Sequence, residues 1–414
     1  MVDIIRSSKY SVLISGVCAL ILAMGIARYS FTPMIPYMQA AETTMTEGLA
    51  GWLAGFNYIG YLVGLFMVWL LRDLRAQDFF YRYGIVIAIV STMIMGCHDH
   101  ALIWYLSRFF AGISTALVFM LGTGLIANWL EHRGHKEDLG IHFAGLGLGI
   151  VIGAIIVDFA AKSIMGGLSW HGQWFALAAF GAVFAIPAIM LLPFPDQDQI
   201  EKFKKQKSHR DDEPSKKWLL MITAAYICAG FSNTTNVTFT SLITELIPLQ
   251  SQGTLMWILV GVAAAPAPYI WEKIAHRTGF LRAIRAAFVI NIVSNLLMVF
   301  ADSSFYAEND PFYCIAISAL LFGFSFMGIV SLTLRVITYK YRYRATQVMA
   351  QLTLGYSLAQ IISPIFTGIV AEQTNSFNIP LFVVSLIMVL GLFCLSVIQR
   401  EGRILPSLRN KPQT

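Results

Sequence analysis

Charged residues are scarce in this sequence. Asp, Glu, Lys and Arg make up 13% of the 414 residues, hydrophobic residues make up 57%, and the mean hydropathy is +0.66. A soluble domain has about a quarter charged residues, so this composition excludes a water-soluble globular protein and indicates a chain that lies mostly in lipid. Each spanning helix needs about 20 apolar residues, and 414 residues therefore accommodate twelve spans without room for a sizeable soluble domain.

Several chemical signatures are also missing. The five cysteines show no CxxC or other metal-ligand spacing. HExxH and GxSxG motifs and paired acids within the apolar blocks are absent, so the sequence predicts no metal, no cofactor and no enzymatic activity. The apolar blocks do not alternate apolar and polar residues, which excludes a transmembrane β-barrel. A channel or sensor would need a selectivity-filter loop or a signalling domain, and the sequence offers neither.

What the sequence does contain is a series of long apolar blocks. They predict an all-α membrane protein with twelve transmembrane helices in two six-helix bundles. The predicted spans are 11–38, 50–71, 83–98, 101–130, 139–161, 173–193, 218–248, 254–271, 283–301, 311–338, 346–370 and 378–398.

Basic residues are distributed unevenly between these spans. With a cytoplasmic N-terminus, almost all of the 29 Lys and Arg lie in cytoplasmic loops, helix ends or tails, and Lys162 alone lies outside. The positive-inside rule therefore predicts a multi-pass protein of the bacterial inner membrane with both termini in the cytoplasm. The basic residues form short patches rather than one binding face, so the expected partners are the lipid bilayer and a small molecule, not nucleic acid.

One long polar segment divides the chain. We predict an N-terminal six-helix bundle over residues 1–195, a cytoplasmic linker over 196–217 and a C-terminal six-helix bundle over 218–414, functional as a monomer. A faint internal repeat relates the halves, because Gly25 and Arg28 in the first span align with Gly230 and Asn233 in the seventh. Two repeated halves with a binding site between them at mid-membrane form a known transporter architecture.

Several motifs resemble those of one family. These are GIARYSFTPMIP at 25–36, FNYIGYLVG at 56–64, RFFAG at 108–112, HFAGLGLGI at 142–150 and AHRTG at 275–279. Together they resemble the YbfB/YjiJ-like branch of the major facilitator superfamily. His276 replaces the usual acid of the last motif, and the 71–75 loop is degenerate, which puts in doubt a conformational latch that depends on the full motif. The resemblance implies the fold of that superfamily and secondary transport by alternating access, without implying a substrate.

Two arginines inside predicted spans are the clearest functional signal. Arg28 and Arg108 would each cost about 2.5 to 3.5 kcal/mol at mid-bilayer, so each should face protein or water and have a partner. One interpretation is snorkelling or a structural ion pair. The other is anion binding, because the guanidinium fork matches a carboxylate or phosphate.

Polar side chains at helical spacing accompany these arginines, where they either line a cavity or form interhelical hydrogen bonds. The predicted substrate-binding residues are Arg28, Tyr29, Asn57, Tyr61, Arg108, Tyr226, Asn233, Asn236, Tyr356 and Gln360.

Carboxylates within the predicted spans are few. Asp158 and Glu245, near the outer ends of their helices, are the candidates for coupling transport to an ion. Because no acid lies as deep as the two arginines, the leading hypothesis is a small organic anion as substrate. The alternative is efflux of amphipathic drug-like compounds, which the aromatic content would also suit. A ladder formed by Gly145, Gly149 and Gly153 predicts close helix packing.

Overall fold

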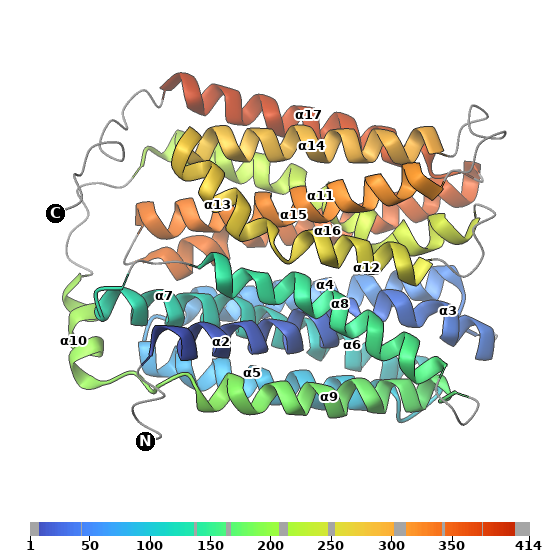
Figure 1. Ribbon diagram of the computed structural model, residues 1–414, viewed down its shortest axis with the longest axis horizontal. Coiled ribbons are helices and arrows are strands. Elements are labelled where there is room, and N and C mark those ends of the chain that lie inside the picture. Colours follow the sequence, from blue (N-terminus) through green and yellow to red (C-terminus); the bar gives the residue numbers. More distant parts are fainter. Residues whose placement is uncertain are drawn as a thin grey trace.

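The computed structural model describes residues 8–42, 44–135, 139–162, 167–206, 214–246, 253–301, 312–341, 344–374 and 376–401. These residues form helices, and no strand occurs among them. Figure 1 shows the helices running side by side, with the first half of the chain in one layer and the second half in the other. We call the end of the molecule that carries α10 the linker end.

The helices of the first half are α2 (Lys9–Leu20), η1 (Ile21–Tyr29), α3 (Phe31–Ala41), α4 (Glu47–Leu70), α5 (Leu74–Met95), α6 (Ala101–Ala116), η2 (Leu117–Leu121), α7 (Gly122–His132), α8 (Gly140–Ala161) and α9 (Trp170–Met190). After α10 (Gln197–Gln206), the second half contains α11 (Lys216–Leu246), α12 (Gly253–Ala264), α13 (Ala267–Thr278), α14 (Phe280–Ala301), α15 (Phe312–Tyr341), α16 (Ala345–Thr374) and α17 (Asn378–Glu401).

Several of these elements join into single crossings. The first crossing is α2–η1–α3 and the fourth is α6–η2–α7, and in the described part of the chain eleven helical stretches are long and apolar enough to span a membrane. α11 completes the predicted twelve: its 31 residues measure about 46 Å at 1.5 Å per residue, although it carries a polar run from Ser232 to Asn236. The predicted all-α membrane fold is confirmed.

The predicted start of the third span is wrong, and the difference changes which residues are buried. The third span was expected at 83–98, but α5 begins at Leu74. Asp73 caps it, because its carboxylate accepts hydrogen bonds from the backbone N–H groups of Arg75 and Ala76, both at 3.1 Å. Much of the expected basic loop at 72–82 is therefore helix, and Asp78 is buried inside the first half.

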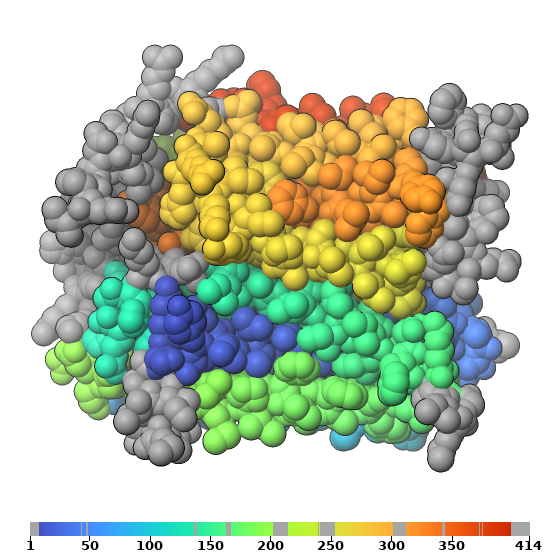
Figure 2. All heavy atoms as spheres, in the orientation of Figure 1, coloured from blue at the N-terminus to red at the C-terminus, as the bar shows by residue number. Residues whose placement is uncertain are grey.

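The most extensive contacts between the two halves are those of α4 with α16 and of α8 with α12. A side chain at Gly147 of α8 would overlap the backbone of Ala265, and one at Gly261 of α12 would press on Ile150 and Val151. In Figure 2 α8 (green) and α12 (yellow) meet directly along the boundary between the halves. Glycine at these positions therefore allows close approach of the two halves.

Equivalent glycine contacts occur within each half. The predicted ladder in α8 packs on the first crossing, where Gly149 touches the backbone of Gly25. In the second half, Gly230 of α11 lies against the backbone of Tyr356 of α16. In the first half, the first crossing (α2–η1–α3) thus packs against the fifth (α8), and in the second half the first crossing (α11) packs against the fifth (α16). This correspondence agrees with the internal repeat.

Candidate functional site

Arg28 lies at the end of a wide helical turn in the first crossing. η1 is a π-helix, in which Ser30 N–H donates to the carbonyl oxygen of Gly25 at 2.9 Å, five residues back. π-helical turns are rare and frequently occur at functional sites. The turn places the Arg28 side chain in the interior, where 4% of the residue is exposed.

Aromatic rings and one amide surround the Arg28 guanidinium. Its central carbon lies 4.3 Å from the ring centroid of Tyr61, 4.7 Å from that of Tyr58 and 5.7 Å from that of Tyr29. Its Nη2 donates a hydrogen bond to Oε1 of Gln360 at 3.3 Å. Because Gln360 belongs to α16, the guanidinium contacts both halves of the chain.

Arg108 has a different environment. Its Nη1 donates to the carbonyl oxygen of Ala27 at 2.9 Å, and its Nη2 donates to the carbonyl oxygen of Arg28 at 3.1 Å. The π-helix η1 ends at Tyr29 and α3 begins at Phe31, and carbonyls at such a helix junction need donors from elsewhere. Arg108 therefore stabilises the break that presents Arg28. Asn57 of α4 in turn donates to the Arg108 carbonyl at 2.9 Å.

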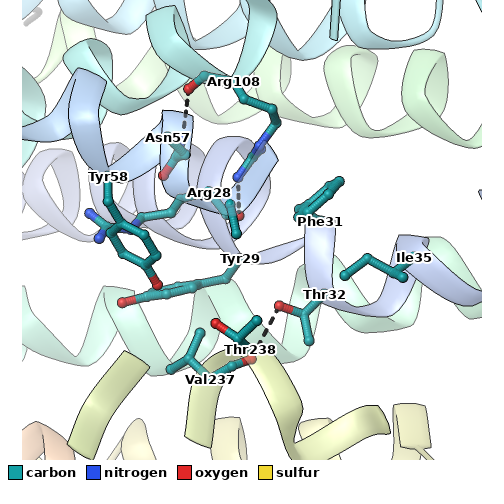
Figure 3. A pocket seen from close by; sticks show the side chains of 11 residues that line it. Arg28, Tyr29, Phe31, Thr32, Ile35, Asn57, Tyr58, Arg108, Val237 and Thr238 are labelled. Atoms are coloured by element: carbon teal, nitrogen blue, oxygen red, sulfur yellow. Dashed lines mark hydrogen bonds between the residues drawn. The ribbon is translucent and has the colours of Figure 1, made fainter. Parts of the chain in front are cut away.

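A small cavity adjoins both arginines (Figure 3). Its volume is about 20 Å³, which is room for one water molecule. Thr32 of α3 closes it against α11 by donating to the carbonyl oxygen of Val237 at 3.4 Å. Residues of both halves thus line the cavity. The lining residues are Arg28, Tyr29, Phe31, Thr32, Ile35, Ala54, Asn57, Tyr58, Arg108, Val237 and Thr238.

The electrostatic balance of the cavity is positive. Within the described ranges, neither Arg28 nor Arg108 forms an ion pair with a carboxylate. Among the described residues, the Nε donors of both arginines are buried without a hydrogen-bond partner. Buried polar atoms are normally paired and buried charges are normally compensated. The arrangement therefore suits a ligand that brings negative charge and hydrogen-bond acceptors.

Most of the other predicted binding residues gather near these arginines. Tyr226 and Tyr356 stack with ring centroids 4.4 Å apart and an interplanar angle of 27°. The ring of Tyr29 meets Trp257 edge-on at 6.1 Å, and its side chain faces the buried Asn233. These contacts extend the polar and aromatic surface from Arg28 into the second half.

Asn236 lies elsewhere in the interior. Its amide donates to the carbonyl oxygen of Ser232 at 2.9 Å and to Oδ1 of Asn295 at 2.8 Å. These bonds belong to a neutral network that joins α11 to α14, and Asn295 donates back to the Ser232 hydroxyl at 3.0 Å. We therefore leave Asn236 out of the proposed site.

Asp158, one of the two coupling candidates, does not line the cavity. Asp158 pairs with Lys162 at 2.6 Å, and their side chains are 36% and 72% exposed. The hydrogen bond and the charge of Asp158 raise the pKa of the Lys162 amine, which lies beyond the end of α8. This pair is a surface feature. The side chain of Glu245 lies outside the described residues.

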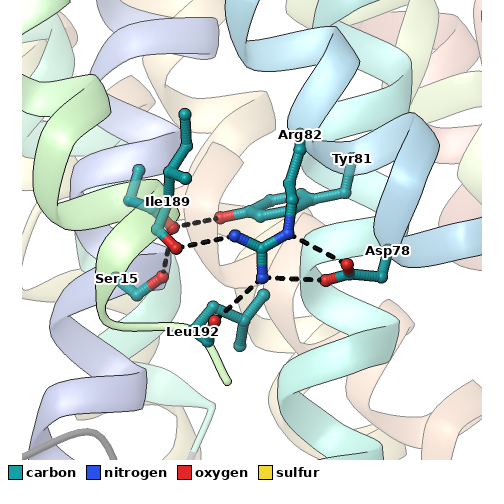
Figure 4. Close-up of polar contacts among 7 residues, drawn as sticks. Ser15, Asp78, Tyr81, Arg82, Ile189 and Leu192 are labelled. Atoms are coloured by element: carbon teal, nitrogen blue, oxygen red, sulfur yellow. Dashed lines mark hydrogen bonds and ion pairs between the residues drawn. The ribbon is translucent and has the colours of Figure 1, made fainter. Parts of the chain in front are cut away.

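Two buried acids near the linker end were not predicted from the sequence. Asp78 pairs with Arg82 at 2.9 Å (Figure 4), and Glu272 of α13 pairs with Arg335 of α15 at 3.2 Å. Both acids lie in segments that were read as loops or helix ends. Each is paired with its own arginine, so neither neutralises Arg28.

Tyr58 was also missed as a binding residue. Its ring packs against the Arg28 guanidinium and lines the cavity. Tyr58 and Tyr61 are three residues apart on α4 and so share a helix face. That spacing was a signal that could have identified Tyr58 beside Tyr61.

Comparison with known proteins identifies the family. Residues 20–396 match the family described as "Uncharacterised MFS-type transporter YbfB". The "Uncharacterized MFS-type transporter YceJ" of Bacillus subtilis (strain 168) is 24% identical over 175 residues, which are 42% of this chain. The match spans 43% of the length of that relative.

Two solved structures share the fold. The nucleoside transporter NupG matches with a TM-score of 0.65 at 13% identity, and the human organic anion transporter MFSD10 (TETRAN) matches with a TM-score of 0.70 at 16% identity. Each match covers 94% of this chain and 99% of the other chain. The family and these neighbours are transporters rather than enzymes. The chain thus belongs to the YbfB-like family of major facilitator superfamily transporters, a membrane-protein family whose members are secondary transporters.

Proposed function

We propose that this transporter moves a small organic anion across the bacterial inner membrane by alternating access, with the linker end in the cytoplasm. The observation that carries the proposal is the pair of buried arginines, Arg28 and Arg108, which have no carboxylate partner in the described part of the chain and face a cavity between the halves. Removing charge from water is costly unless it is paired, so an anion would gain strongly from this site.

The position of the site suits alternating access. Most of its lining comes from the first half, while α11 and Gln360 of α16 close it from the second half. Toward the linker end, Gly147 abuts Ala265, and on the other side of the site Thr32 bonds to Val237. A rocking motion that opens one side would break one set of contacts and keep the other.

The lining also suggests the shape of the anion. Beside the guanidinium groups, Tyr29, Phe31 and Tyr58 present aromatic surfaces to the cavity. A carboxylate attached to a flat apolar body would use both features. One structural neighbour is described as a nucleoside transporter and another as an organic anion transporter, so the choice of an anion rests on the arginines of this chain.

Efflux of amphipathic drug-like compounds is the competing function. The same aromatic walls favour it, but two positive charges would repel cationic compounds. Thermal unfolding of the purified protein separates the two, because a ligand that binds only the folded state raises its stability. We expect benzoate to raise the melting temperature and its uncharged analogue benzamide to leave it unchanged. Stabilisation by the cation rhodamine 6G without stabilisation by benzoate would contradict the anion proposal.

A further inference from the structure

The bond between Arg28 and Gln360 has an unusual feature for a buried arginine. Arginine only donates hydrogen bonds, so the Gln360 amide must present its oxygen to Nη2. At 3.3 Å this bond is longer than the 2.7 to 2.9 Å of typical charge-assisted pairs. The neighbouring Nε of Arg28 is buried and has no hydrogen-bond partner among the residues that the structure describes. Of the two nitrogens on this edge of the guanidinium, Nη2 therefore has a partner, which is uncharged, and Nε has none among the described residues.

Arg82 shows how the same edge looks when it is filled. Its Nε donates to Oδ2 of Asp78 at 2.9 Å, and its Nη2 donates to Oδ1 at 3.1 Å (Figure 4). A carboxylate thus binds the Nε and Nη2 edge with both oxygens. The Gln360 amide has only one oxygen, and it reaches only Nη2 of Arg28.

We propose that Gln360 is an internal substitute for the substrate carboxylate: its Oε1 holds the position on Arg28 that one carboxylate oxygen takes, and the arriving anion displaces it. This inference rests on the proposed anion function. A carboxylate displaces the amide because it carries charge and fills both Nε and Nη2. The amide meanwhile protects part of the guanidinium from being buried without a partner.

Displacement would also change how the two halves are held together. Arg28 lies in η1 of the first half and Gln360 lies in α16 of the second half. When the anion replaces Gln360, this side-chain link between the halves is lost. Anion binding is thereby coupled to release of one half from the other. A transporter needs this release when its binding site switches from facing one side of the membrane to facing the other.

The test compares two substitutions of similar size at one position. Gln360→Glu supplies a tethered carboxylate that fills the Arg28 edge permanently, whereas Gln360→Met removes the acceptor and keeps the length of the side chain. We expect benzoate to bind Gln360→Glu about 30-fold more weakly than the parent or worse, the effect of losing a buried charge contact. Gln360→Met should bind benzoate at least as tightly as the parent. Calorimetry with purified protein measures both, with benzamide as the uncharged control.

A measurement without ligand checks that the tethered carboxylate reaches Arg28. Gln360→Glu should melt at a higher temperature than Gln360→Met, and this difference should vanish when both are combined with Arg28→Gln. A difference that persists without Arg28 would overturn the proposed contact.

Two failures can be told apart. If benzoate binds the parent and Gln360→Glu equally while Arg28→Gln loses it, the substitute role of Gln360 is overturned and the anion function stands. If benzoate does not bind the parent, or binds Arg28→Gln as well as the parent, the anion function itself fails and the inference fails with it.

Discussion

Arg82 at the linker end is half-buried and Arg28 at the centre is buried, and the surroundings of these two arginines of the first half differ. Arg82 has Asp78 on one edge of its guanidinium and also donates to the carbonyl oxygens of Ile189 at 2.8 Å and Leu192 at 2.9 Å. These carbonyls belong to the end of α9, where the helix itself offers no donors. In the described part of the chain, Arg28 donates to a neutral amide, that of Gln360, and its Nε has no hydrogen-bond partner. A guanidinium whose edges are filled is part of the scaffold, and one with an open edge is a candidate binding group.

Arg108 is intermediate between these two. Two of its nitrogens donate to backbone carbonyls, yet its Nε has no partner and its side chain lines the cavity. We therefore regard Arg108 as a residue that positions Arg28 and adds positive charge, with Arg28 as the main ligand of the anion.

The largest expected effect on stability comes from Arg82→Gln. It removes the partner of buried Asp78 and two donors to the end of α9, and breaking a buried ion pair costs about 3 to 5 kcal/mol. Arg28→Gln, the matched control, should leave the melting temperature unchanged or raise it, because it removes a buried charge that lacks a counter-charge. Thermal unfolding in detergent compares the two. Equal losses of stability would contradict the distinction between scaffold and site.

Arg108→Gln should have a smaller effect on stability and a clear effect on binding. The Gln amide can still donate to one of the carbonyl oxygens of Ala27 and Arg28, and the other loses its donor at a cost of about 1 to 3 kcal/mol. The break between η1 and α3 would then hold Arg28 less firmly, so benzoate binding should also weaken. Arg108→Lys keeps the charge but cannot donate to both carbonyls in the fixed geometry of the fork. Normal stability in both variants would show that Arg108 does not support the break.

The smallest effects are expected for two asparagines on α11. Asn236→Ala breaks one interhelical hydrogen bond, to Asn295, and such a bond contributes about 0.6 kcal/mol, so the substitution should leave benzoate binding unchanged. Asn233→Ala should leave stability nearly unchanged, because its Oδ1 has no partner. The amide nitrogen of Asn233 is the atom that donates to a carboxylate, so the substitution should weaken benzoate binding by up to about tenfold, the value of one hydrogen bond. The reverse pattern would place the site on the other face of α11.

The sequence was sufficient to predict the helices and the two central arginines. Backbone groups in lipid must be bonded within the helix, so long apolar blocks can be read directly as spans. A lone arginine in such a block stands out for the same reason. The internal repeat was also readable, since Gly25 and Gly230 are both packed against the fifth crossing of their own half.

Other parts of the site depended on tertiary contacts that no sequence pattern shows. The role of Arg108 follows from a π-helical turn and a helix break in a different crossing. Asn233 and Asn236 are both asparagines and lie three residues apart on α11, yet of the two only Asn233 faces the arginine cluster. Asp78 was missed because α5 begins nine residues before the predicted span at 83.

The affinity of the protein for benzoate with and without the Arg28 charge tests the central claim most directly. Isothermal calorimetry should show that the parent binds benzoate and not benzamide. Arg28→Gln should weaken benzoate binding by about 2 to 5 kcal/mol, roughly 30-fold or more, and Arg28→Lys should fall between because it keeps the charge without the fork. Binding of benzoate to a folded Arg28→Gln protein with the parent affinity would contradict the assignment of Arg28 as the anion ligand.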